Sequence, residues 1–341
     1  MLHGWIILDK PVGLGSTQAV SAVKRILREA GEPKTKVGHG GTLDPLASGV
    51  LPIALGEATK LAGRLLDATK DYEFAVRFGE ETDTLDAEGE VVESSDVRPA
   101  CEEVEAMLPR FTGTIEQIPP AYSALKIGGK PAYQRSRAGE QVEMKARTVT
   151  VFALEFLPAS LARGEGDRAQ HGGGVARQPN PSTTSGGPPP PASRGKEFIT
   201  LAATVSKGTY IRSLARDIAR ALGTVGHVTM LRRTRAGPFT LEKAISLDFL
   251  VNAAKERRLD GAVLPLIAAL DDIPALPVTC RQAELLRHGQ TLAGFPAKGP
   301  HQSPTLMGPT PGLYLATDDD RPVALVEASA GGLRVVRGFN L

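Results

Sequence analysis

The chain has 341 residues and a net charge of +2, with 41% hydrophobic and 23% charged residues, which is ordinary globular composition. It has no run of about 20 apolar residues, which excludes a transmembrane helix. Its two cysteines, Cys101 and Cys280, lie far apart without a C-x-x-C motif, so neither a disulfide framework nor a zinc site is expected, and a reducing cytosol fits.

The N-terminal apolar run Gly4–Asp9 predicts a buried strand rather than a signal peptide, because it lacks a basic leader and meets an acidic residue early. Glycine and proline end this strand, and Ser16 or Thr17 is predicted to cap a helix. Apolar residues then recur at helical spacing until Gly31, where the helix is predicted to stop.

The next segment combines a glycine-rich loop with an apolar strand. Residues 38–43 precede Asp44, and the strand predicted over 50–55 follows, with a helix from about 57 to 66. Alternating residues predict two further strands, over 72–78 and 147–157.

A strand over 198–205, a helix over 209–222 and a short strand over 228–235 are predicted next. Strands and helices do not alternate regularly enough for a doubly wound parallel sheet, so the fold class expected is α+β. After about Pro274, short strands, glycine and proline predict a small β-rich C-terminal domain.

Residues 163–196 differ in composition from the rest of the chain. They are dominated by Gly, Pro, Ser, Arg and Gln, include four consecutive prolines and contain no aromatic residue before Lys196. Such a segment buries too little surface to offset its ordering entropy, so a disordered insertion between two adjacent strands is predicted.

Basic residues gather in three stretches although the net charge is low. Such stretches suit a surface that follows phosphates, and the alternative is ordinary solvated surface. The stretches are Lys24, Arg25, Arg28, Lys34 and Lys36; Lys126, Lys130, Arg135, Arg137, Lys145 and Arg147; and Arg232, Arg233 and Arg235.

Common catalytic signatures are missing: there is no Walker A loop, no G-x-G-x-x-G and no H-E-x-x-H. Residues 83–89 carry several acidic side chains, but their spacing is wrong for a calcium loop, and a polar hairpin is the favoured interpretation.

Two segments stand out as candidates for chemistry. Asp44 follows a glycine-rich turn beside an apolar run, which would let it project into a cleft, although Asp-Pro after glycines is often only a turn. Arg212 falls in the first turn of a predicted helix, where its charge opposes the dipole unless an anion offsets it. That anion is expected to be a phosphate or a buried carboxylate such as Asp44.

Several ordered motifs together resemble the TruB family of tRNA pseudouridine synthases, over roughly residues 3–157 and 197–250. The sequence departs from the family at Gly15, where threonine is frequent, and in the insertion. The motifs are Leu8-Asp9-Lys10-Pro11, Gly38-His39, Gly41-Thr42-Leu43-Asp44-Pro45, Tyr72, Pro119-Pro120 to Lys126, Lys207 to Arg212, and Gly226 to Phe239.

The resemblance implies a pseudouridine synthase fold: a mixed, largely antiparallel sheet with flanking helices. The catalytic domain is expected over 1–273, with an RNA-clamping loop region at 119–147. A small PUA-like RNA-binding domain is expected over 274–341.

The resemblance also implies isomerisation of uridine 55 in the tRNA T loop, after the target base is flipped out. Asp44 would be the catalytic carboxylate, acting as nucleophile or as base at C2′, and Arg212 would keep it ionised. Tyr72 would stack on the uracil and help to move the C5 proton. No cofactor or metal is expected.

The remaining implied site residues bind the substrate. His39 would hold the flipped nucleotide or fill the vacated space, Tyr210 and Leu231 would wall the pocket, and Lys10 would support the site. The T arm of tRNA is the expected partner of a cytoplasmic monomer with no obligate protein partner. The alternatives are a guide-RNA-dependent synthase and a non-catalytic RNA-binding or tRNA-folding protein.

Overall fold

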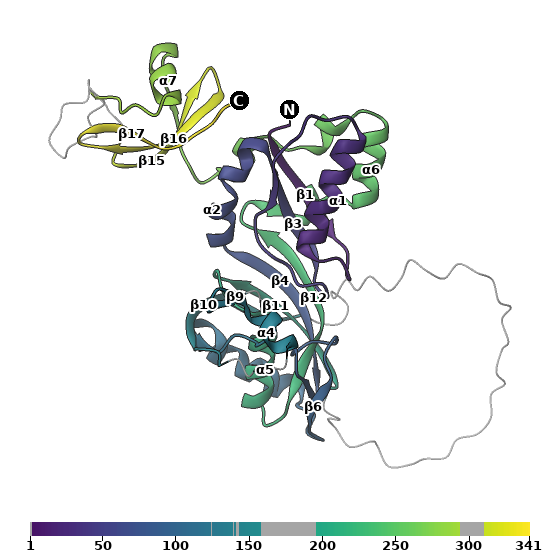
Figure 1. Ribbon diagram of the computed structural model, residues 1–341. Coiled ribbons are helices and arrows are strands. Elements are labelled where there is room, and N and C mark those ends of the chain that lie inside the picture. Colours follow the sequence, from purple (N-terminus) through teal and green to yellow (C-terminus); the bar gives the residue numbers. More distant parts are fainter. Residues whose placement is uncertain (1, 124, 139, 141–142, 158–195, 294–309) are drawn as a thin grey trace, which may run out of the picture. The chain divides into compact units, whose positions relative to one another are not determined.

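The computed structural model describes residues 2–123, 125–138, 140, 143–157, 196–293 and 310–341. The predicted insertion lies outside these residues, apart from Lys196. The chain forms two compact units: the first joins Met1–Lys70 to Arg232–Leu341, and the second is Asp71–Leu231 (Figure 1). The domain boundary expected between residues 273 and 274 stays a prediction.

The first unit is built around two buried strands. β1 (Gly4–Lys10) runs antiparallel to β3 (Ser48–Leu55), and every residue of β3 is buried. The C-terminal end of β12 (Gly226–Ala236) pairs in parallel with the start of β3, β2 (Val37–His39) pairs antiparallel with β3, and β13 (Phe239–Thr240) pairs with β12. Both strands are buried on both faces, which explains why β1 and β3 are continuous apolar runs in the sequence.

Two helices of the first unit, α1 (Ser16–Glu29) and α6 (Leu247–Lys255), lie side by side (Figure 1). Trp5 anchors the core beneath the sheet: its ring lies 5.6 Å from that of Phe239, and its indole N–H donates to the carbonyl of Leu266 at 3.1 Å. The other helical segments of this unit's N-terminal and middle parts are η1 (Gly56–Lys60), α2 (Ala62–Asp67), η3 (Leu241–Lys243), η4 (Leu259–Ala262) and η5 (Leu266–Ala269).

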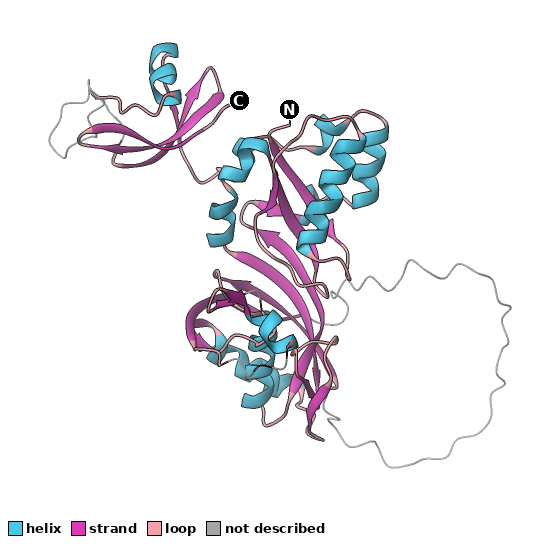
Figure 2. Ribbon diagram, viewed as in Figure 1, coloured by secondary structure: helices cyan, strands magenta, loops and turns pink. Residues whose placement is uncertain are grey.

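The C-terminal part of the first unit is a small four-stranded sheet covered by α7 (Cys280–Arg287), as Figure 2 shows. It docks onto the rest of the unit through the amide of Asn340, which donates to Glu57, and the ammonium of Lys60, which donates to the carbonyl of Gly338. The strands are β14 (Ala275–Pro277), β15 (Gly312–Asp318), β16 (Arg321–Ser329) and β17 (Gly332–Gly338).

The second unit contains a sheet in the order β4-β11-β10-β7. Its β5–β6 and β8–β9 ladders are separate hairpins. The strands are β4 (Lys70–Phe78), β5 (Glu80–Thr82), β6 (Val91–Ser94), β7 (Gly113–Gln117), β8 (Lys126–Ile127), β9 (Lys130–Pro131), β10 (Arg147–Leu157) and β11 (Phe198–Val205). The helical segments are α3 (Cys101–Met107), η2 (Leu108–Phe111), α4 (Ala132–Arg137) and α5 (Ile211–Ala221).

The α+β class, the mixed and largely antiparallel sheet and the small C-terminal sheet are confirmed. The polar hairpin predicted around residues 83–89 is confirmed as β5–β6. No helix among the described residues is long and apolar enough to cross a membrane.

Two local predictions were wrong. The helix expected over 57–66 is divided into η1 and α2, which meet at Leu61. The cap of α1 is Gly15, whose amide donates to the side chain of Gln18 at 2.8 Å, rather than Ser16 or Thr17. The hydroxyl of Ser16 does not cap the helix because it is bonded to the backbone of Leu43, in the loop before β3.

Candidate active site

Asp44 lies in the loop between β2 and β3, half-buried between buried Leu43 and exposed Pro45. Its own carbonyl accepts from the amide of Ala47 at 3.1 Å, which closes a turn. The chain therefore presents this carboxylate from a tight turn at the start of a fully buried strand.

The residues on either side of Asp44 are tied to the N-terminal segment. The hydroxyl of Ser16 donates to the carbonyl of Leu43 and accepts from its amide, both at 2.8 Å. The carbonyl of Pro45 accepts from the ammonium of Lys10 at 3.3 Å and from the amide of Gly13 at 2.8 Å.

Lys10 is completely buried, and its ammonium also donates to the carbonyls of Pro11 at 2.9 Å and Leu14 at 2.7 Å. A buried cation is tolerated only where several acceptors replace its water. Lys10 therefore ties together the segment after β1 and the loop that holds Asp44.

Arg233 is a second buried cation against the same loop, with 1% of its surface exposed. Its guanidinium donates to the carbonyls of Val50 at 2.8 Å and of Thr42 and Gly41, both at 3.3 Å. The parallel pairing of β12 with β3 sets Arg233 opposite Gly49, where a Cβ would lie 2.2 Å from the carbonyl oxygen of Arg233. Only glycine fits at that position, since its φ is also +99°.

His39 ends β2 and is half-buried. Burial lowers its pKa from the ordinary value of 6.5, and the nearby charge of Arg233 lowers it further. Its Nδ1 accepts from the amide of Gly41 at 3.4 Å, which leaves Nε2 as the protonated nitrogen of the neutral ring.

In the second unit, Arg212 follows the N-cap residue Tyr210 by two positions at the start of α5. Its guanidinium pairs with the carboxylate of Asp86 at 3.0 Å, and both side chains are buried. It also donates to the carbonyls of Thr84 at 2.8 Å and Tyr122 at 2.9 Å. A buried carboxylate was expected opposite this arginine, and Asp86 is one that the sequence did not single out.

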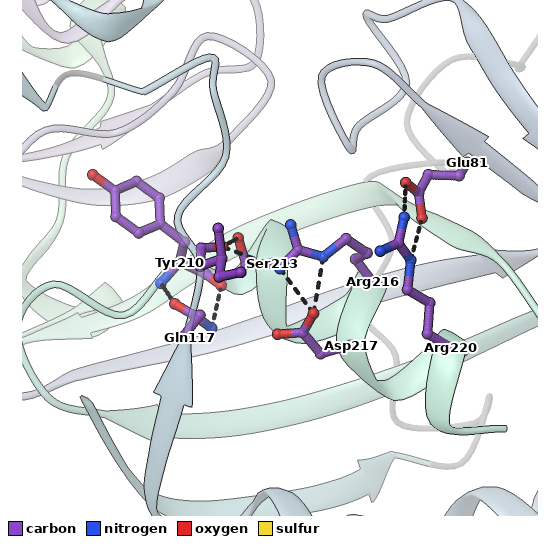
Figure 3. Close-up of polar contacts among 8 residues, drawn as sticks. Glu81, Gln117, Tyr210, Ser213, Arg216, Asp217 and Arg220 are labelled. Atoms are coloured by element: carbon purple, nitrogen blue, oxygen red, sulfur yellow. Dashed lines mark hydrogen bonds and ion pairs between the residues drawn. The ribbon is translucent and has the colours of Figure 1, made fainter. Parts of the chain in front are cut away.

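The N-terminus of α5 is held by Gln117, which is buried at the end of β7. Its side-chain oxygen accepts from the amide of Tyr210 at 2.8 Å, and its amide nitrogen donates to the Tyr210 carbonyl at 3.1 Å. Figure 3 shows the Tyr210 ring pointing away from Gln117. Ser213 adds a hydrogen bond to the carbonyl of Ile118 at 2.8 Å.

Further along α5, two arginines make ion pairs within the second unit (Figure 3). Arg216 pairs with Asp217 at 2.8 Å, and Arg220 pairs with Glu81 at 2.7 Å. The other predicted residues of this unit are Tyr72, half-buried on β4, and Leu231, buried on β12.

The structure groups the predicted site residues by unit: Lys10, His39 and Asp44 belong to the first, and Tyr72, Tyr210, Arg212 and Leu231 to the second. Their roles, and the pairing expected between Arg212 and Asp44, stay predictions. The sequence missed Ser16, Asp86, Gln117 and Arg233.

Both interpretations left open for the basic stretch 232–235, a surface that follows phosphates and ordinary solvated surface, are wrong for Arg233. Arg233 is buried, and Arg232 pairs with Asp9 at 2.9 Å. Successive side chains of a strand point to opposite faces, so Arg232 and Arg233 lie on different faces of β12. The face that carries Arg233 is buried.

Comparison with protein families gives two matches. The N-terminal domain of the TruB family of pseudouridylate synthases matches residues 24–166, and the C-terminal domain of tRNA pseudouridylate synthase B matches residues 212–271.

Curated relatives match over the whole chain. It is 53% identical to the tRNA pseudouridine synthase B of Novosphingobium aromaticivorans, covering 100% of this chain and 98% of the relative. It is 52% identical to the protein of the same name from Zymomonas mobilis, covering 99% and 96%.

Among solved structures, a chain of an H/ACA ribonucleoprotein bound to a substrate RNA containing 2′-deoxyuridine is 25% identical, with a TM-score of 0.65 and coverage of 99% of this chain and 86% of that one. A chain of a Cbf5-Nop10-Gar1 complex is 26% identical with a TM-score of 0.64, covering 99% and 85%.

Proposed function

The chain belongs to the TruB family of pseudouridylate synthases, and from this premise we propose that it converts uridine 55 in the T loop of tRNA to pseudouridine. The observation that carries the proposal is the anchored loop that presents the carboxylate of Asp44. The loop on both sides of it is fixed by Ser16, Lys10 and Arg233. A loop that is already fixed before substrate arrives loses little backbone entropy when it presents its catalytic group.

The reaction is an isomerisation, so its atoms balance without a co-reactant. The C1′–N1 bond breaks, the uracil turns, a C1′–C5 bond forms, and the proton displaced from C5 is replaced by one on N1. Asp44 acts at the sugar, either as a nucleophile at C1′ or as a base at C2′. Both routes require an ionised carboxylate.

The roles proposed for the second unit are those that membership of the TruB family implies. Arg212 is assigned to keep Asp44 ionised and oriented when substrate is bound. Tyr72 stacks on the uracil and assists the C5 proton transfer. The Asp86 pair and the two backbone carbonyls fix the Arg212 guanidinium, so it is a rigid donor rather than a mobile surface arginine.

The target base must leave the folded T loop before it reaches Asp44. We assign His39 to the flipped nucleotide or to the space it vacates; its lowered pKa keeps the ring neutral, so it donates through Nε2 without adding charge. Tyr210 and Leu231 form the walls of the uracil site, and Lys10 supports the catalytic loop.

A guide-RNA-dependent synthase is the second candidate, favoured by the likeness to a chain of an H/ACA ribonucleoprotein. The stand-alone function is preferred because the relatives that are more than 50% identical are named tRNA pseudouridine synthase B. The basic residues of segment 119–147 fit a loop that clamps the T arm without a guide. On this proposal the protein is a cytoplasmic monomer with no obligate protein partner.

The test is pseudouridine formation by the purified protein alone on an unmodified tRNA transcript. Tritium release from C5-labelled uridine reports turnover, and mass spectrometry after cyanoethylation locates the product, because uridine and pseudouridine have equal mass. Product at position 55 without guide RNA supports the proposal. No product, or product only with added guide RNA, overturns it, and tight tRNA binding without product would indicate a non-catalytic binder.

A further inference from the structure

A basic groove lies between the C-terminal half of α1 and the segment that leads into β2, and it is separate from the Asp44 loop. Its volume is about 920 Å³. We call it the α1–β2 groove. It is lined by Lys24, Leu27, Arg28, Glu32, Pro33, Lys34, Thr35, Lys36 and Val37.

The charge of this groove is unbalanced. Four of its side chains are cationic (Lys24, Arg28, Lys34 and Lys36) and one is acidic (Glu32). The four cations are exposed, and none makes a side-chain hydrogen bond or ion pair with another described residue.

Lys24 and Arg28 are four residues apart on α1, so their like charges sit one above the other on the same helix face. Such a pair destabilises a helix unless an anion lies between the charges. No carboxylate of the described residues pairs with Lys24 or Arg28, which points to an anion from outside the chain.

Backbone hydrogen bonds fix the segment that lines the groove, while its cationic side chains are exposed to solvent. The amide of Glu32 donates to the carbonyl of Leu27 at 3.0 Å, and the amide of Gly56 donates to the carbonyl of Lys36 at 2.8 Å. Buried Leu27 and Val37 form its floor. The cations therefore project from a fixed backbone, which lowers the entropy lost on binding.

The groove is also connected to the candidate active site by one short strand. Lys36 immediately precedes β2, and β2 ends at His39. At about 3.3 Å per residue, these two residues are roughly 10 Å apart along the strand. A nucleic acid whose reacting nucleotide is held at His39 and Asp44 would thus bring further phosphates within reach of the groove.

We propose that the α1–β2 groove binds the sugar-phosphate backbone of the substrate RNA beyond the nucleotide that reacts. This inference rests on the proposed function, since it takes the RNA to be the tRNA substrate. Lysine and arginine side chains neutralise phosphates and release counterions, so their contribution to affinity falls as salt rises.

The test is binding of a full-length tRNA transcript by the triple variant Lys24→Gln, Arg28→Gln, Lys34→Gln, between about 50 and 200 mM salt. Affinity is expected to fall about tenfold or more at the low-salt end. The slope of log Kd against log salt should become less steep by about 2, near the value for three lost phosphate contacts.

Two companion variants isolate the groove from general charge. Lys243→Gln, Lys255→Gln, Arg257→Gln removes three exposed cations of the same unit outside the groove and should change affinity and slope little. Lys24→Arg, Lys34→Arg keeps the groove charge and should bind like wild type. Circular dichroism and thermal melting establish that all variants are folded.

The inference is overturned if the groove variant binds tRNA with wild-type affinity and slope, or if the control triple loses as much as the groove triple. Its failure is distinct from failure of the proposed function, because pseudouridine formation by wild-type protein is measured in parallel. Wild type that makes pseudouridine while the groove variant binds normally refutes the groove alone. Wild type that makes none refutes the proposed function whatever the groove does.

Discussion

Arg212 and Asp86 form a buried ion pair, with Nη1 and Oδ2 3.0 Å apart and side-chain exposures of 6% and 4%. Thr84 donates its hydroxyl to Oδ1 of Asp86 at 2.5 Å, and the amide of Glu88 donates to the same oxygen at 3.1 Å. The carboxylate thus has partners on both oxygens, which is what makes a buried charge tolerable.

We expect Asp86→Ala to lower the free energy of unfolding by about 3–5 kcal/mol, because it breaks the buried ion pair with Arg212. The matched control is Glu88→Ala in the same hairpin, where an exposed side chain should matter by no more than about 0.5 kcal/mol. Urea denaturation measures both.

The double variant Arg212→Met, Asp86→Leu extends this test. Replacing both charges by apolar groups should recover much of the stability lost by Asp86→Ala, without recovering turnover. Stability losses that simply add would show that the two side chains do not act as a pair.

Arg233 should act as a positioning residue for the Asp44 loop. Arg233→Met leaves two loop carbonyls and the β3 carbonyl of Val50 without this donor, so the free energy of unfolding should fall by about 3 kcal/mol or more. If the loop is misplaced, kcat falls more than KM for tRNA rises. The neighbouring, partly exposed Arg232→Met is the control, and Arg233→Lys should restore only part of kcat because an ammonium lacks the fork geometry. Equal effects of Arg232→Met and Arg233→Met on kcat would contradict this role.

The lowered pKa of His39 predicts a pH effect on stability. Since the pKa in the folded state lies below 6.5, the unfolded chain binds more protons than the folded one just below that pH. This contribution is fully present above pH 6.5 and is lost as the pH falls from there through the folded-state pKa. His39→Gln should therefore lose less stability than wild type between neutral and acidic pH, whereas exposed His288→Gln should follow wild type. Parallel curves for wild type and His39→Gln in pH-dependent urea unfolding would rule out this assignment.

The elements that carry their own pattern were predictable from the sequence. The continuous apolar run of β1, the helical spacing of α1 and the alternation in β10 each reflect one local environment. Asp44 could be located because the loop motif that holds it is contiguous.

Residues whose burial depends on distant pairing were not predictable. Arg233 stands in a run of arginines that suggests a surface, and only the parallel register of β12 on β3 turns it inward. Asp86 belongs to a polar hairpin, and its burial follows from a bridge between its backbone and Val228, over 140 residues later in the chain. The break between η1 and α2 was also hard to predict. The residue at the break is leucine, a good helix former, rather than glycine or proline.

The most direct test of the account is single-turnover tritium release by Asp44→Asn, measured together with its tRNA affinity. Because binding rests on phosphate contacts and shape while the chemistry rests on one charge, affinity should stay within about tenfold of wild type. Turnover should disappear. Residual activity above about 5% of wild type in a preparation free of wild-type enzyme, with pseudouridine still formed at position 55, would contradict the central claim and move the catalytic role to another residue.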